Sequence, residues 1–179
     1  EWLYEPAWPP QPLAAREPAS LRGAWVVLDD GAGRAEALRE EIARRGGSVL
    51  CCVPREASRE GALAIDASEA AGYSQALERA AQGGELAGVV SLWPLRVPAL
   101  AAEDVPSEGQ RFGTEAALLL LQAVAARAAP TPPRVWIVTA GSQRVDGTET
   151  LRLEQAPVAG LARVAASEHP ELRVTLVDL

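Results

Sequence analysis

The sequence predicts one α/β domain built on a doubly wound parallel sheet, and three observations lead to this prediction. Short apolar runs typical of covered strands alternate with amphipathic helical patterns along the chain. A length of 179 residues fits a single domain, which buries roughly 70% of its unfolded surface. Apolar residues make up 48% and charged residues 23%, an ordinary globular composition. Strands alternating with helices form βαβ units with right-handed crossovers, and hence a parallel sheet.

Residues 1–20 are predicted as an N-terminal strand and linker, and residues 21–179 as the core. The alternating residues Trp2, Tyr4, Pro6 and Trp8 give this strand an aromatic face. Residues 9–20 are rich in Pro and Ala and indicate an exposed connector. Aromatic rings bury about 150–250 Å² each, so the aromatic face is a candidate anchor for a partner.

The first repeat of the core begins with a continuous apolar run at 24–28, typical of a strand covered on both faces. A turn at 29–33 leads into an amphipathic helix that the Gly46–Gly47 pair ends. The apolar face of this helix carries Ala35, Leu38 and Ile42.

The second repeat has a covered strand at 48–53, a polar loop at 54–61 and a short strand end at 64–66. A helix then runs to the Gly83–Gly84 pair. One face of that helix carries Tyr73, Leu77 and Ala80.

The remaining strands are predicted at 86–93, 134–139 and 172–179. A Pro-punctuated loop at 94–108 and a helix at 110–128, ending before Pro130, connect the first two of these strands. A loop at 140–152 and a helix at 155–168, ending before Pro170, connect the last two.

The helix at 110–128 contains four consecutive leucines, Leu118 to Leu121. At about 100° per residue they cover about 300° of the helix, so they cannot all face one sheet. Two interpretations stay open: contact with another domain, or enclosure by the loop at 94–108.

Lysine and methionine are both missing from the chain. All 17 basic residues are arginine, and the chain has no lysine and no methionine. Without lysine there is no Schiff-base chemistry, no Gly-Lys-Ser/Thr phosphate loop and no Tyr-x-x-x-Lys reductase pair. Without methionine the chain has no initiator, so we expect it to be a segment of something longer.

The charge and the residue types of the chain also make some classes of binding partner unfavourable. A net charge of −7 disfavours nucleic acid and anionic membranes as partners. No apolar run is long enough to span a membrane and no signal-peptide pattern is present, so we expect a cytoplasmic protein. One histidine and the adjacent Cys51 and Cys52 give no zinc-binding spacing, and the two cysteines are interpreted as buried thiols.

The turn Gly31-Ala32-Gly33 is the first candidate site, because it follows a strand and opens a helix as a dinucleotide turn does. The third glycine position of the fingerprint holds Glu36, and Asp29 and Asp30 would oppose a pyrophosphate. We therefore predict a plain helix-starting turn. An Asp29/Asp30 phospho-acceptor pair would need a late lysine, which is missing.

Three further candidates lie after later elements. Asp66 could contact adenine or ribose, but Asp66 or Ser68 is more simply a helix N-cap. Ser142, in Thr139-Ala140-Gly141-Ser142, would need a tyrosine and a lysine on the next helix to be catalytic, so we predict an ordinary loop residue. His169 is predicted to play a structural role at a helix end. No catalytic, cofactor-binding or metal-binding residue is assigned.

The C-terminal part carries a resemblance to a known family. Residues 155–172, with the tail Glu168-His169-Pro170-Glu171-Leu172, and residues 176–179 resemble the N-terminal structural half of the ketoreductase region of modular polyketide synthases. Residues 4–8, 25–33, 89–93 and 136–142 resemble that family in the same order. The family's Trp-Gly before Leu-Gly-Arg is replaced by Ala159-Gly160 before Leu161-Ala162-Arg163.

This resemblance implies a truncated Rossmann-like, short-chain-dehydrogenase-like fold that binds no cofactor. It implies a non-catalytic scaffold for a second half, which carries NADPH and the Ser-Tyr-Lys residues and reduces a β-ketoacyl chain on an acyl carrier protein. The implied partners are that catalytic half and neighbouring enoylreductase, dehydratase, methyltransferase and carrier domains. Two alternatives stay open: a pseudo-ketoreductase scaffold in a non-reducing or methylating module, and a free-standing NAD(P)-dependent dehydrogenase.

Overall fold

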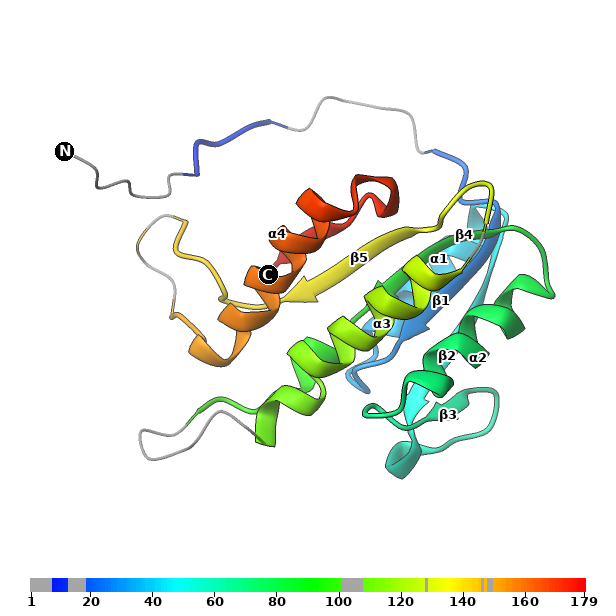
Figure 1. Ribbon diagram of the computed structural model, residues 1–179, viewed down its shortest axis with the longest axis horizontal. Helices are drawn as coiled ribbons and strands as arrows, with labels where there is room; N and C mark the ends of the chain where they lie inside the picture. The colour runs from blue at the N-terminus through cyan, green and yellow to red at the C-terminus, as the bar shows by residue number, and fades with distance from the viewer. Residues whose placement is uncertain (1–7, 13–18, 101–107, 128, 146, 148–149) are drawn as a thin grey trace.

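A computed structural model describes residues 8–12, 19–100, 108–127, 129–145, 147 and 150–179 (Figure 1). Its six-stranded sheet is parallel throughout, with the strand order β3-β2-β1-β4-β5-β6. The strands are β1 (Gly23–Leu28), β2 (Gly47–Pro54), β3 (Leu63–Ile65), β4 (Leu86–Ser91), β5 (Arg134–Thr139) and β6 (Thr175–Asp178). The helices are α1 (Arg34–Arg44), α2 (Ala70–Ala81), α3 (Thr114–Ala126) and α4 (Ala156–Glu168). The predicted α/β class and doubly wound parallel sheet are confirmed.

The helices are distributed unequally between the two faces of the sheet. The crossover from β1 to β2 steps one way along the sheet, and those from β3 to β4, β4 to β5 and β5 to β6 step the other way. Because parallel crossovers are right-handed, α1 lies on one face, the back, and α2, α3 and α4 lie on the other, the front. Figure 1 shows these three helices side by side over the sheet.

The larger apolar core lies between the front of the sheet and these three helices. Leu28, Ile137, Tyr73 and Leu120 are at most 1% exposed in it. A smaller back cluster packs α1, through Ala35 and Ile42, against β1 and its neighbours. This division follows the period-2 alternation of the strands, since successive side chains point to opposite faces.

Several predicted bounds are wrong by a few residues. The strand predicted at 86–93 ends at Ser91, and Trp93–Arg96 is a 3-10 helix with Pro94 in its first turn. The helix predicted at 110–128 is preceded by a 3-10 helix, Glu108–Arg111, and the one predicted at 155–168 by another, Leu153–Gln155. Each of these 3-10 segments precedes an α-helix or begins beside a proline, where i,i+3 bonding is common.

The last predicted strand, 172–179, is shorter than expected. Pro170–Leu172 form a 3-10 helix, and Arg173 has a φ of 46°, which ends that helix and delays β6 until Thr175. The strand predicted over residues 1–8 lies outside the described residues except for Trp8, which is in no regular element.

The four leucines of α3 divide between core and surface. Leu120 and Leu121 are buried, Leu119 is half-buried and packs on the core, and Leu118 is 41% exposed. Of the four, Leu118 is therefore the one available for contact with another domain.

Candidate functional site at the carboxyl edge of the sheet

The loops after β1 and β4 form the point where a doubly wound sheet places its ligand. β1 and β4 are neighbours, and the chain leaves them toward opposite faces, so the crevice between their carboxyl ends is the topological switch point. Here the two loops are joined directly. Arg96 Nη1, after β4, donates to the Asp30 carbonyl oxygen, after β1, over 3.1 Å.

The turn after β1 uses its own carboxylates as hydrogen-bond acceptors. Asp29 Oδ1 accepts from the Gly31 N–H at 2.8 Å, and Asp30 Oδ1 accepts from the Ala32 N–H at 3.2 Å. Gly31 and Gly33 have φ of 80° and 85°, a conformation that favours glycine. α1 begins immediately after Gly33, so the turn opens a helix at the predicted place.

Arginines compensate the two carboxylates of this turn. Arg59 Nη2 lies 2.5 Å from Asp29 Oδ2, and Arg34 Nη1 lies 2.7 Å from Asp30 Oδ2. The Asp29 and Asp30 side chains are only 3% and 2% exposed, so each buried charge is paired. The turn therefore presents negative side chains, already hydrogen-bonded, where an anionic ligand would need free N–H groups.

The two cysteines lie on opposite faces of β2 and are free thiols. Cys52 is fully buried in the front core, as predicted, but Cys51 is only half-buried on the back and lies 3.9 Å from Asp29. Burial and the Asp29 charge raise the pKa of Cys51, so it remains a protonated thiol.

Asp66 is not the helix cap that the sequence predicts. α2 begins at Ala70 with Glu69 at the N-cap, and no side chain of the described residues caps this helix. Asp66 Oδ1 instead accepts from the Ser68 N–H at 3.0 Å and from Arg111 at 3.2 Å. These donors, the Ser68 N–H first and the Arg111 guanidinium second, lower the pKa of Asp66. Ser68 contributes its backbone N–H, not a cap.

An aromatic group fills the space beside the crevice. The guanidinium groups of Arg96 and Arg111 both lie over the Phe112 ring, at 5.0 and 5.3 Å from its centroid. Trp93 meets Phe112 edge to face at 5.7 Å, and Tyr73 meets Trp93 at 6.0 Å. This stack was not predicted from the sequence. Its signal is the single Phe of the chain, preceded directly by an arginine.

The loop after β5 is held by a carboxylate from β6. Asp178 accepts from Thr139 Oγ1 at 2.7 Å, from the Ser142 N–H at 3.0 Å and from the Gln143 N–H at 3.1 Å. Ser142 Oγ contacts Thr139 Oγ1 at 3.2 Å. Tyr73 lies in the front core and Tyr4 outside the described residues, so no tyrosine in the described part of the chain reaches Ser142. The role of Asp178 in this loop, like the aromatic group around Phe112, was not predicted from the sequence.

The residues just before α4 form a buried polar cluster. Arg152 Nε lies 2.6 Å from Glu154 Oε1, and Gln155 Nε2 donates to the Pro94 carbonyl at 2.8 Å. Burial acts to raise the pKa of Glu154, but backbone N–H groups and Arg152 hold it below its usual value. Ionised Glu154 and fully buried Gln155 thus tie the start of α4 to the loop after β4.

His169 lies at the C-terminal end of α4, as predicted, with its Nδ1 3.1 Å from Glu171 Oε1. Both side chains are about half exposed. This position is compatible with the predicted structural role.

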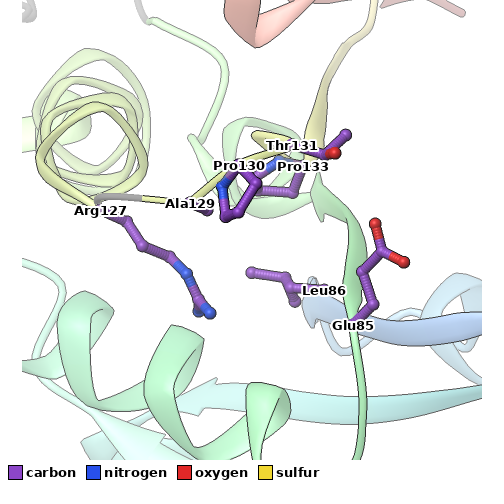
Figure 2. Close-up of a pocket in the computed structure, with 7 residues that line it drawn as sticks. All are labelled: Glu85, Leu86, Arg127, Ala129, Pro130, Thr131 and Pro133. Atoms are coloured by element: carbon purple, nitrogen blue, oxygen red, sulfur yellow. The ribbon is translucent and has the colours of Figure 1, made fainter.

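A pocket lies at the opposite edge of the sheet. It lies at the amino ends of β4 and β5 (Figure 2). Its volume is about 320 Å³. Glu85 and Arg127 line its sides, with Leu86 and Pro130 between them. Arg127 donates to the Leu77 carbonyl at 3.1 Å. The candidate residues from the sequence lie away from this pocket, at the carboxyl edge and at the end of α4.

Metal-ligand clusters and membrane-spanning helices are both absent from the described residues. Among them, no three His, Cys, Asp or Glu side chains are grouped so that they could share a metal ion. No helix in the same part of the chain has the length and apolar character needed to cross a membrane.

Sequence comparison matches residues 7–179 to the family described as polyketide synthase extender module SpnB, Rossmann fold domain. A phenolphthiocerol/phthiocerol polyketide synthase of Mycobacterium tuberculosis is 29% identical over 181 residues, which cover 99% of this chain and 7% of that protein. Polyketide synthase GfsB of Streptomyces halstedii is 33% identical over 190 residues, or 99% of this chain and 3% of that protein. The chain thus spans less than a tenth of these relatives.

Solved structures with the same fold include reductases. The adenylation, ketoreductase and pseudo Asub structure of a keto acid-selecting NRPS module superposes with a TM-score of 0.78 at 20% identity, over 96% of this chain and 14% of that one. The first ketoreductase of the tylosin PKS superposes with a TM-score of 0.62 at 25% identity, and the match covers 88% of this chain and 30% of that one. A short-chain dehydrogenase/reductase from Serratia marcescens superposes with a TM-score of 0.65 at 17% identity, and the match covers 89% of this chain and 78% of that one.

Proposed function

The chain belongs to the Rossmann fold domain family of polyketide synthase extender modules, and from this premise we propose that it is the non-catalytic, structural half of a ketoreductase region. In this role it binds no nicotinamide cofactor and supports a second half that holds NADPH and reduces a β-ketoacyl chain. The observation that carries the proposal is the turn after β1, where the Asp29 carboxylate already accepts the hydrogen bond of the Gly31 N–H.

A pyrophosphate at this turn would have to displace Asp29 and Asp30 or lie against them. Displacement breaks the contacts of both carboxylates with Arg59 and Arg34. If they stay in place, the pyrophosphate lies against two carboxylates of like charge. We expect this repulsion to exceed the roughly 0.3–1 kcal/mol by which a helix dipole stabilises an exposed anion. The Arg96–Asp30 bond also joins the two loops between which the rest of a dinucleotide would lie, and the same Arg96 guanidinium lies over the Phe112 ring.

The loop after β5 supports the same proposal. A reductase of this fold needs a tyrosine and a lysine near Ser142 to move a proton, and the chain has no lysine at any position. The corresponding start of α4 holds Glu154, which pairs with Arg152, and Gln155, whose Nε2 donates to the Pro94 carbonyl. These residues stabilise loops and offer no proton donor to a bound carbonyl group.

We assign the contact with the catalytic half to the groove between α3 and α4. This groove of about 210 Å³ is lined by Leu118, Leu121, Leu161 and Val164 and bordered by Glu168 and His169. Leu118 and Val164 are 41% and 51% exposed, so apolar surface remains open on adjacent helices. An apolar helix pair with a polar rim is the usual composition of a protein interface. This supports the interpretation of the leucine run as a domain contact.

NADPH titration tests the absence of a cofactor site. We expect this chain to give no saturable change in NADPH fluorescence up to about 1 mM, the upper end of usual KM values. The whole ketoreductase region of the same synthase, titrated in parallel, is the positive control. Saturable micromolar binding by the chain alone contradicts the proposal.

Charge insertion in the groove tests the support function. Val164→Asp should lower reductase activity of the whole region roughly tenfold or more, because it places a charge against an apolar partner surface. Leu153→Asp is the matched control, since Leu153 is 71% exposed in the 3-10 helix before α4 and does not line this groove. Equal activities of the two variants would remove the assigned interface.

A further inference from the structure

The back of the sheet becomes progressively more exposed away from α1. The strand registers place Val27, Val90, Trp136 and Thr175 in one row across β1, β4, β5 and β6. Val27 is 0% exposed, Val90 7%, Trp136 is half-buried and Thr175 is exposed. In the next row Val138 is 8% and Val177 37% exposed. Burial therefore decreases from β1 to β6.

Two indole rings form the centre of this surface. Gly88 lies between them, and a Cβ on Gly88 would meet Cζ3 of Trp25 at 2.5 Å and Cζ3 of Trp136 at 2.9 Å. The missing side chain lets the rings approach to a centroid distance of 5.4 Å. The Trp25 N–H donates to the Leu21 carbonyl. The Trp136 ring extends the apolar surface toward β6.

Parallel sheets are normally covered on both faces by helices. In the described part of the chain α1 is the helix on the back, and it packs on β1 and β2. Strands lie about 4.8 Å apart and packed helices about 8–10 Å apart. A helix laid beside α1 on this face would therefore lie over β4, β5 and β6, where the exposure increases.

We propose that the back of β5 and β6, formed by Trp136, Val138 and Val177 with Arg134 at the rim, is a docking surface for one amphipathic helix from elsewhere in the same synthase polypeptide. The assignment of this helix to the same polypeptide rests on the proposed function. The helix continues the layer that α1 begins on this face.

The charge of Arg134 indicates which residue type the docked helix carries at one end. Arg134 shares the back-facing parity of Trp136 on β5 and is exposed. Among the described residues it has no ion-pair partner, whereas Arg34 and Arg59, beside the turn after β1, are each paired with an aspartate. The docked helix therefore carries an apolar stripe toward Trp136 and Val177 and an Asp or Glu toward Arg134.

Site-specific photo-cross-linking in the intact synthase tests this surface. A benzophenone amino acid replaces Val177, and in a second protein it replaces Val164 on the front groove. Both positions are exposed, so neither label disturbs the core. We expect the label at 177 to cross-link to a segment outside residues 1–179 of the same polypeptide, with helical apolar spacing and an acidic residue. Arg134→Glu should lower that yield about fivefold or more, and Arg79→Glu, an exposed arginine on α2, should leave it unchanged.

The two labels separate this inference from the proposed function. Cross-linking at 164 but not at 177, at 177 to a second copy of the synthase, or at 177 to a non-helical segment overturns the docked helix and leaves the scaffold function intact. Cross-linking at 177 without any at 164 supports the docked helix and contradicts the assigned contact with the catalytic half.

Discussion

The front and the back of the sheet differ in how completely the described chain covers them. On the front, three helices bury Ile137 to 0% exposure, whereas on the back one helix leaves Val177 at 37%. The cause is topological: three right-handed crossovers with α-helices step in one direction, and of the two connections that step in the other only the one from β1 to β2 carries an α-helix. A strand order thus decides which face a chain completes by itself and which face it leaves for another segment.

The largest expected contrast compares a front leucine with a back valine. Leu120→Ala removes a side chain that is 1% exposed in the front core and should cost about 2–5 kcal/mol of unfolding free energy. Val177→Ala should cost less than about 1 kcal/mol, because its side chain is already partly in water. Urea unfolding measures both. Equal losses would mean that the back is as well covered as the front.

The next largest change in unfolding free energy is expected at the Trp25–Trp136 indole pair. Gly88→Ala forces a methyl group against Trp25 and should destabilise the chain by about 1–3 kcal/mol. Gly160→Ala is the matched control, because no described atom outside its own helix lies within 4 Å of the added methyl group and the residue is inside α4. That change should stabilise by about 0.5–1 kcal/mol. A neutral Gly88→Ala would contradict the close approach of the two rings.

A double-mutant cycle measures the direct coupling of the rings. Trp25→Leu and Trp136→Leu should show an interaction energy of about 0.5–1.5 kcal/mol, as expected for an aromatic pair at 5.4 Å. The pair Trp136 and Trp93, on opposite faces, should show a coupling near zero. Similar values for both pairs would argue for a general loosening of the sheet.

The smallest effect at neutral pH concerns the thiols of β2. Burial raises the pKa of Cys52, on the front, to about 12, from an ordinary value of 9.0. Because the folded pKa is the higher one, Cys52 contributes stability below pH 9.0 that is lost as the pH rises toward about 12. Iodoacetamide should modify half-buried Cys51 first and Cys52 only on unfolding. Mass spectrometry of each peptide checks the order, and equal rates would contradict the burial difference.

The strands and helices were predictable because each carries its own periodicity. The apolar run at 24–28 and the pattern of Ala35, Leu38 and Ile42 need no tertiary information. The Asp29–Gly33 turn was also predictable, since adjacent carboxylates and positive-φ glycines specify its local hydrogen bonds.

The rest of the site depends on contacts that are distant in sequence. Asp178 reaches Ser142 across 36 residues, and Arg96 reaches Asp30 across 66. The Asp66 cap was wrong because Arg111, 45 residues away, takes its carboxylate, and α2 starts later at Ala70. The exposure of Leu118 became clear only from the orientation of α3 on the sheet.

The indole pair also makes the back of the sheet optically active in its own right. Two indoles at 5.4 Å and 31° couple their electronic transitions and add a circular dichroism contribution to that of each ring alone. A helix arriving on this face would exclude water from the half-buried Trp136 ring and change that signal. The molecule thus contains a label-free sensor at the surface where its environment is expected to change.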